Sequence, residues 1–97
     1  MSAGPTQEDF AKRVNRACQV RHSSGSVEMH LLECRKLNSP GRSGHREPFA
    51  LLFRGPKAPV LPQRIYQFDF EDLGSVEIFI VPIGPDDSGM RYEAIFA

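Results

Sequence analysis

The stretch GSVEIFIVPIG, residues 74–84, constrains the fold more than any other part of the chain. In an extended conformation both of its sides are largely apolar, and Glu77 is the only charge. The two sides are formed by Val76, Ile78 and Ile80 and by Phe79, Val81 and Ile83. The segment is bounded by glycines and is too short for a stable buried helix, so it predicts a strand that is covered on both faces.

Length and composition set the class of protein. A chain of 97 residues predicts one domain, and 40% hydrophobic residues are enough to build its core. The 12 basic and 12 acidic side chains cancel, which removes the electrostatic footprint expected of a nucleic-acid binder.

The cancellation hides an asymmetry between the two halves of the chain. Residues 1–57 carry ten Lys/Arg and five Asp/Glu, a net charge of +5, whereas residues 58–97 carry two and seven, a net charge of −5. If the fold keeps the halves apart, the domain has a basic and an acidic side that allow head-to-tail association. The alternative is that neighbouring strands interleave the charges.

No segment predicts a membrane association. The longest apolar runs, FALLF and IFIVPI, are far shorter than the roughly 20 residues of a spanning helix. The N-terminal stretch MSAGPTQEDF lacks the apolar core of a signal peptide, so we expect a cytoplasmic protein. Cys18 and Cys34 are too few for a disulfide framework, and we expect free thiols on apolar strand faces.

A short helix is predicted over residues 5–15. Thr6 stands at the N-cap position with Asp9 as its capping-box partner, and Phe10 and Val14 follow at helical spacing to pack on a sheet. Residues 1–5 are expected to form a flexible tail, and residues 38–47, rich in Ser, Pro, Gly and charge, a mobile loop.

Alternation with a period of two predicts strands in most of the remaining chain. The predicted strands are 17–22, 27–36, 48–54, 64–70, 74–84 and 90–97. The segment GPKAPVLPQ must cross an edge or close an end because its prolines lack donors, and Pro82 places the far end of its strand at a sheet margin or a bulge. The fold class is therefore mostly β: a small antiparallel barrel or sandwich of about six strands with one short N-terminal helix.

Metal-ligating residue types cluster in the first half of the chain, at Cys18, His22, His30, Cys34 and His45. Spacings of four residues put Cys18 with His22, and His30 with Cys34, on common strand faces. At about 3.3 Å per residue the members of each pair are about 13 Å apart, too far for one ion with bonds near 2.0–2.3 Å. We therefore predict no metal and no cofactor.

The candidate catalytic groups also give no indication of an enzymatic activity. Ser23 and Ser24 lie in an apparent hairpin turn near His22, with nothing like a nucleophile elbow. The carboxylates near residues 69–72 and 86–87 lie on a solvent face and in a loop, where nothing tunes them for proton transfer. We expect a protein that is not an enzyme.

Several side chains sit opposite the main apolar stripe of their predicted strands and are candidates for partner binding. Either the N-terminal helix or another molecule must cover the apolar ones, and Arg54 is placed to bond a carboxylate such as Glu93. The candidates are Leu32, Leu52, Arg54, Phe79, Val81 and Ile95.

The run FALLFRGPKAPVLPQRIYQFDFEDLGSVEIFIVPIG, followed by the terminal RYEAIFA, resembles a family of small bacterial proteins of unknown function. The resemblance covers residues 48–97 and rests on the Phe-x-Leu-Leu-Phe-Arg-Gly-Pro centre and the Tyr-Glu-Ala-x-Phe terminus. It implies an accessory or structural component that accompanies phage-tail-type collar or fibre proteins, and it supplies no catalytic residues. The family typically has Gly where this chain has Arg64.

Two functions follow as hypotheses. The first is a non-catalytic binding or assembly module, an accessory or structural subunit of a phage-tail-like or fibre assembly, whose partner is another protein or a second copy rather than nucleic acid or membrane. The alternative is a small ligand-binding barrel or hydrolase with a pocket at the Pro-rich end, around Arg54, Tyr66 and Tyr92.

Overall fold

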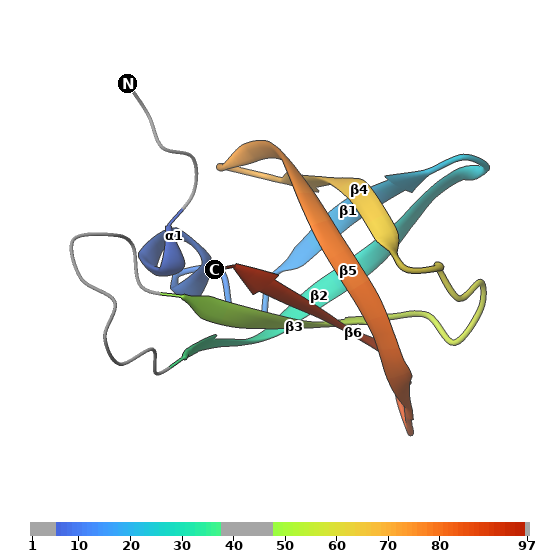
Figure 1. Ribbon diagram of the computed structural model, residues 1–97. Coiled ribbons are helices and arrows are strands. Elements are labelled where there is room, and N and C mark those ends of the chain that lie inside the picture. Colours follow the sequence, from blue (N-terminus) through green and yellow to red (C-terminus); the bar gives the residue numbers. More distant parts are fainter. Residues whose placement is uncertain (1–5, 38–47, 97) are drawn as a thin grey trace.

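The computed structural model describes residues 6–37 and 48–96, and it shows a closed barrel of six antiparallel strands with one short helix (Figure 1). The order of strands around the barrel is β1-β2-β3-β6-β5-β4. The elements are α1 (Gln7–Ala11), β1 (Ala17–His22), β2 (Gly25–Lys36), β3 (Phe49–Gly55), β4 (Arg64–Phe70), β5 (Gly74–Asp86) and β6 (Gly89–Phe96). The prediction of a mostly-β barrel or sandwich is confirmed, and the structure decides for the barrel.

The helix is shorter than predicted. Thr6 and Asp9 form the expected capping box, with each side chain bonded to the other residue's backbone N–H. The helix ends at Ala11 because the chain then turns toward β1: Asn15 adopts a left-handed φ of 73° and donates its N–H to the Leu31 carbonyl at 2.6 Å. The predicted tail of residues 1–5 and loop of residues 38–47 lie outside the described residues.

Phe10 anchors the helix α1, which lies at one end of the barrel beside the ends of β3 and β6 (Figure 1). Its ring is fully buried, and its centroid lies 5.9 Å from that of Phe49, 5.8 Å from that of Phe70 and 5.5 Å from that of Phe96. Val14 packs on the same core. The helix therefore works as an apolar plug for this end of the barrel.

The Pro-rich segment between β3 and β4 closes the opposite end of the barrel. This is one of the two roles predicted for the segment, which had either to cross an edge or to close an end. Leu61 is buried there, and its backbone N–H donates to the hydroxyl of the fully buried Tyr92 at 2.9 Å. The Tyr66 hydroxyl donates to the Pro62 carbonyl at 2.7 Å. Two inward tyrosines thus satisfy the backbone of a segment that cannot join a ladder.

Side chains from every strand fill the interior between these two ends. The predicted alternation is clear in β4, where Tyr66, Phe68 and Phe70 are buried, and the interior contains no buried polar or charged side chain among the described residues. The fully buried large residues are Val20, Met29, Leu31, Phe49, Leu51, Phe53, Phe68, Ile78, Ile80 and Tyr92, together with Phe10.

The prediction that residues 74–84 are covered on both faces is wrong. Ile78 and Ile80 point into the barrel, but Phe79 and Ile83 remain 47% and 41% exposed. A single-layered barrel has only one interior, and α1 covers an end of it rather than its wall (Figure 1). The outer face of β5 is therefore left to solvent, and the alternative in which the helix covers the outward apolar residues is wrong as well.

The long strands β2 and β5 each change partner midway. β2 pairs with β1 over residues 25–30 and with β3 over residues 30–36, and β5 pairs with β4 over residues 74–80 and with β6 over residues 81–86. Each carries a bulge in its second half, at Leu32 and at Ile83. Pro82 lies at the second bulge, as predicted.

The topology keeps the two oppositely charged halves of the chain apart, because β1, β2 and β3 are neighbours and so are β6, β5 and β4. The interleaved alternative is therefore wrong. The halves neutralise each other where they meet, since ion pairs join arginines of the first half to aspartates of the second. These pairs are Arg13–Asp72, Arg16–Asp72, Arg21–Asp69 and Arg54–Asp86.

The Pro-rich closure leads to a stability prediction. We expect Tyr92→Phe to lower the free energy of unfolding by roughly 1–3 kcal/mol, because the buried N–H of Leu61 loses its acceptor. Tyr66→Phe is the matched control. It frees the carbonyl of the exposed Pro62, which water can reach, so its effect is expected to be smaller. Urea unfolding of both variants measures the difference, and equal losses would contradict this account of the closure.

Candidate interaction surface

All six predicted partner-binding residues lie on the outer wall of the barrel, but the structure groups only some of them. Leu52 of β3 pairs with Glu93 of β6, which pairs with Val81 of β5, so these residues form one row across three strands. Leu32 lies at the β2 bulge and is half-buried. Arg54 belongs to a separate polar network.

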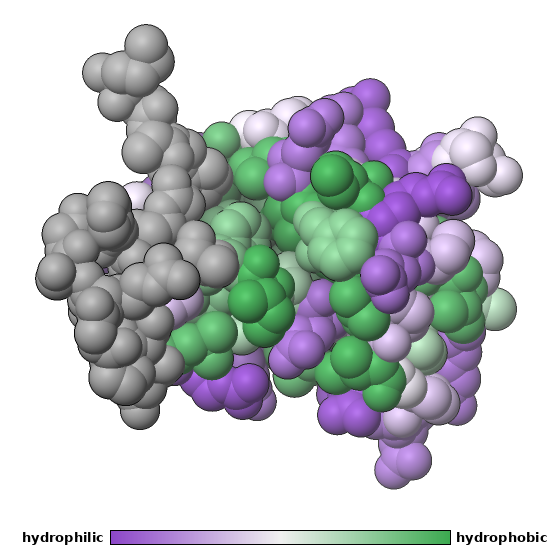
Figure 2. Space-filling model, in the orientation of Figure 1, coloured by the Kyte–Doolittle hydropathy of each residue, from purple (hydrophilic) through white to green (hydrophobic). Residues whose placement is uncertain are grey.

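Phe79 and Ile95 are the most exposed members of the predicted set. Phe79 pairs across β5 and β4 with Ile65, which is 60% exposed, and Ile95 is 55% exposed on β6. We call Ile65, Phe79, Val81 and Ile95 the outer apolar patch. Figure 2 shows hydrophobic surface over β5 and β6 on this face, bordered by hydrophilic surface. Three large, half-exposed hydrophobic side chains on neighbouring strands are unusual for a wall that faces only water.

Ile65 was not among the predicted residues, although the sequence contained the signal. The alternation of β4 places Tyr66, Phe68 and Phe70 inward, so the residue before Tyr66 must face outward. An isoleucine at such a position, opposite Phe79 in the neighbouring strand, could have been selected once the β4–β5 register was known.

A shallow groove of about 270 Å³ lies beside the outer apolar patch. Ala50, Leu51 and Leu52 of β3 line it, with Ile83 from the β5 bulge. Its charged lining combines both signs: Glu33 and Arg35 from β2, and Arg91 and Glu93 from β6.

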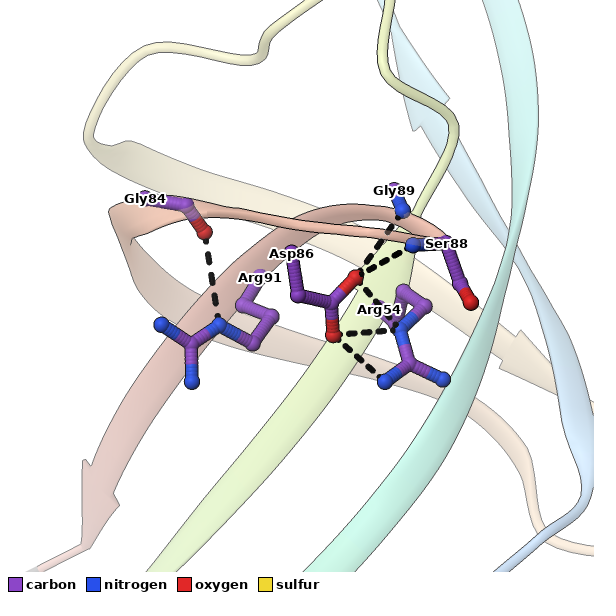
Figure 3. A network of polar contacts seen from close by, with 6 residues as sticks. All are labelled: Arg54, Gly84, Asp86, Ser88, Gly89 and Arg91. Atoms are coloured by element: carbon purple, nitrogen blue, oxygen red, sulfur yellow. Dashed lines mark hydrogen bonds and ion pairs between the residues drawn. The ribbon is translucent and has the colours of Figure 1, made fainter.

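Arg54 binds a carboxylate, as predicted, but the partner is Asp86 rather than Glu93. Its Nε lies 3.0 Å from Oδ2 of Asp86, and its Nη2 bonds the same oxygen (Figure 3). Asp86 also accepts the N–H groups of Ser88 at 2.8 Å and Gly89 at 3.0 Å. The hydrogen bonds from these donors lower the pKa of Asp86, and the bond from the Arg54 guanidinium has the largest effect. Asp86 therefore orders the β5–β6 turn rather than lying free in a loop.

Gly89 is required in this turn for a steric reason. A Cβ atom at this position would lie 2.1 Å from the carbonyl oxygen of Gly55. The close approach lets β6 start directly beside the end of β3, so that Arg54 reaches Asp86.

The potential metal ligands are not brought together. Cys18 is buried in the barrel, where burial raises the pKa of its thiol to about 12, while His30 is exposed on the outer wall. The prediction that His30 and Cys34 share a face is wrong, because the bulge at Leu32 turns Cys34 back toward the core. Within residues 6–37 and 48–96, no three Cys, His, Asp or Glu side chains form a metal-binding group. His45 lies outside these residues.

The remaining catalytic candidates have structural partners. The His22 ring accepts the Ser24 N–H at 3.2 Å in the β1–β2 turn. Hydrogen bonds from Ser75, Gln67 and Arg21 lower the pKa of Asp69 to about 2, so this carboxylate stays ionised near neutral pH. Such a group is a poor general acid or base.

Arg54, Tyr66 and Tyr92 do not converge on a common pocket. Both tyrosine hydroxyls are occupied by the Pro-rich segment, and the Arg54 side chain points to Asp86 on the outside of the barrel. The alternative function with a pocket at this end gains no support from the geometry.

The only helix in the part of the chain that the structure describes is too short to cross a membrane.

The Arg54–Asp86 contact predicts a pH dependence of stability. The pKa of Asp86 is lowered in the folded state, so its contribution is present above the ordinary value of 3.8 and is lost as the pH falls through the folded-state pKa. We expect Asp86→Asn to unfold at lower urea concentration than the wild type at neutral pH, and the difference to shrink in acid. Asp87→Asn, an exposed neighbour outside this network, is the control. A difference that does not depend on pH would contradict this role of the carboxylate.

Comparison with known proteins assigns the chain to a family without extending the functional argument. No curated protein and no solved structure matches the chain. A family model described as a domain of unknown function, DUF6916, matches residues 5–96, nearly the whole sequence. The chain therefore belongs to the DUF6916 family.

Proposed function

We propose that this domain is a non-catalytic binding or assembly module that makes protein–protein contacts through the outer wall of β4, β5 and β6. The observation that carries the proposal is the outer apolar patch, in which Ile65 and Phe79 form an exposed cross-strand pair and Ile95 is exposed on β6. Burial of such side chains contributes about 25 cal/mol per Å² of apolar surface, so a partner that covers them gains binding free energy.

The rest of the barrel supports a contact role. Three of its aspartates have structural partners: Asp69 and Asp72 bind arginines of the first half, and Asp86 caps a turn. Its two ends are plugged by Phe10 and Leu61. The outer wall of the barrel is therefore the surface available for contacts with another protein.

The resemblance of residues 48–97 to proteins that accompany phage-tail collars and fibres supports a more specific setting. An accessory or structural subunit of a tail-like or fibre assembly has to present a rigid surface to other subunits, and a barrel with plugged ends offers one. The cytoplasmic location suggested by the sequence remains a prediction.

Replacement of Phe79 tests the proposal. We expect Phe79→Ser to keep the fold, because the side chain lies outside the core, and to weaken association measured by light scattering over a concentration series and by co-purification with the products of flanking genes. Val60→Ser is the matched control, since Val60 is 48% exposed but lies outside the outer apolar patch.

Two results would contradict the proposal. One is a wild-type protein that stays monomeric at every concentration and binds none of the neighbouring gene products. The other is association that Phe79→Ser and Val60→Ser change to the same extent.

A further inference from the structure

One edge of β5 has no partner strand. Residues 74–80 pair with β4 on one side, but pairing with β6 on the other side begins only at Val81, opposite Glu93. The same register continued by two residues would place Phe79 opposite Ile95, yet the ladder ends first. Figure 1 shows β5 and β6 separating toward the end of the barrel that α1 covers. Along residues 74–80 this edge therefore presents backbone donors and acceptors that no other described strand pairs.

β2 has the same two kinds of open edge as β5. Residues 25–29 of β2, which correspond to residues 74–80 of β5, also lack a described partner on the β3 side, but their outward residues Ser26 and Glu28 are polar. The other edge of β2, which corresponds to residues 81–86 of β5, is covered by the chain before β1. Where β2 leaves β1, Leu31 is paired with the chain before β1: its carbonyl accepts the Asn15 N–H at 2.6 Å, and its N–H donates to the Arg16 carbonyl at 3.1 Å. Gln7 of α1 then contacts Cys34 farther along the strand. In the described residues nothing comparable covers residues 74–80 of β5.

Proline distinguishes the two open edges of β5. Over residues 81–86 the strand has no partner on the β4 side within residues 6–37 and 48–96, and this half contains Pro82 and Pro85, which lack donors and discourage strand addition. Residues 74–80 contain no proline and are the half able to extend the sheet.

Charge and hydrophobicity define what would fit this edge. Phe79 and Ile95 are exposed on its outer side, and Glu77 lies on the edge strand itself. Glu93 stands where the pairing with β6 ends. Neither glutamate has an ion-pair partner among the described residues, and Arg64 lies on the β4 side of the strand, away from the open edge.

We propose that residues 74–80 of β5 bind an extended segment of another protein by strand addition. On its outward face the segment would carry apolar residues against Phe79 and Ile95 and Lys or Arg near Glu77 and Glu93, at positions two residues apart. The proposal rests on the function proposed above and names the chemistry of the partner. A second copy of this chain fits less well, because antiparallel pairing of its own residues 74–80 with this edge would set Glu77 opposite Glu77.

Two short model peptides of opposite charge test this proposal on the full chain. In one peptide, lysine and valine alternate along one face of the extended strand, with threonine between them (Lys-Thr-Val-Thr); the other has glutamate in place of lysine. Amide chemical shifts and hydrogen exchange report where each peptide binds. We expect the lysine peptide to protect amides of residues 74–80 and to bind roughly five-fold more tightly than the glutamate peptide.

Charge reversal on the edge strand gives the second arm. Glu77→Lys is expected to reverse the preference between the peptides, whereas Asp87→Lys, the same charge change on an exposed turn residue, is expected to leave it unchanged. These readouts are independent of the light-scattering and co-purification test of Phe79→Ser, so strand addition can fail while the binding module stands.

Three outcomes would overturn the inference. The first is that neither peptide protects residues 74–80. The second is that both peptides bind alike or that Asp87→Lys has the same effect as Glu77→Lys. The third is protection of residues 74–80 that rises with protein concentration in the absence of peptide, which would make a second copy the occupant.

Discussion

The barrel depends on two strands that are long enough to serve two neighbours each. β2 and β5 leave one partner and take up another near His30 and Ile80, and a bulge in each second half adds the twist that this change requires. Without this change the strands would form an open, twisted sheet with two long free edges. With it, a chain of 97 residues encloses one continuous aromatic core.

The same change of partner creates the surfaces that we associate with function. A strand that has moved from β4 to β6 leaves one edge unpaired on each side of the crossover. In the second half of β2 the N-terminal segment covers this edge, and in the second half of β5 prolines blunt it. Among the described residues neither kind of protection is present at residues 74–80, and the outer apolar patch includes Phe79 of this segment. The exposed edge and the exposed apolar side chains are thus two results of one topological feature.

Charge has a structural task in this molecule. The basic first half and the acidic second half form the two sides of the barrel, and their arginines and aspartates meet at the two junctions, β1 with β4 and β3 with β6 and β5. Exposed ion pairs of this kind contribute little stability each. These ion pairs instead favour the correct strand register, because Arg21 reaches Asp69 and Arg54 reaches Asp86 only when the barrel closes correctly.

Alternation along the sequence determined which residues face inward in strand segments without a bulge, and the plug residues Phe10 and Leu61 lie in segments whose role the sequence also indicated. That information is local, since side chains two apart share a face whatever the neighbouring strand is. Which other parts of the chain cover or bond a given side chain is a different property. Whether Phe79 is buried, whether Cys34 shares a face with His30, and which carboxylate Arg54 binds depend on strand order, on a bulge and on pairing between distant segments. These were decided only by the tertiary structure, because hydrogen-bond partners and covering layers come from parts of the chain that no local pattern specifies.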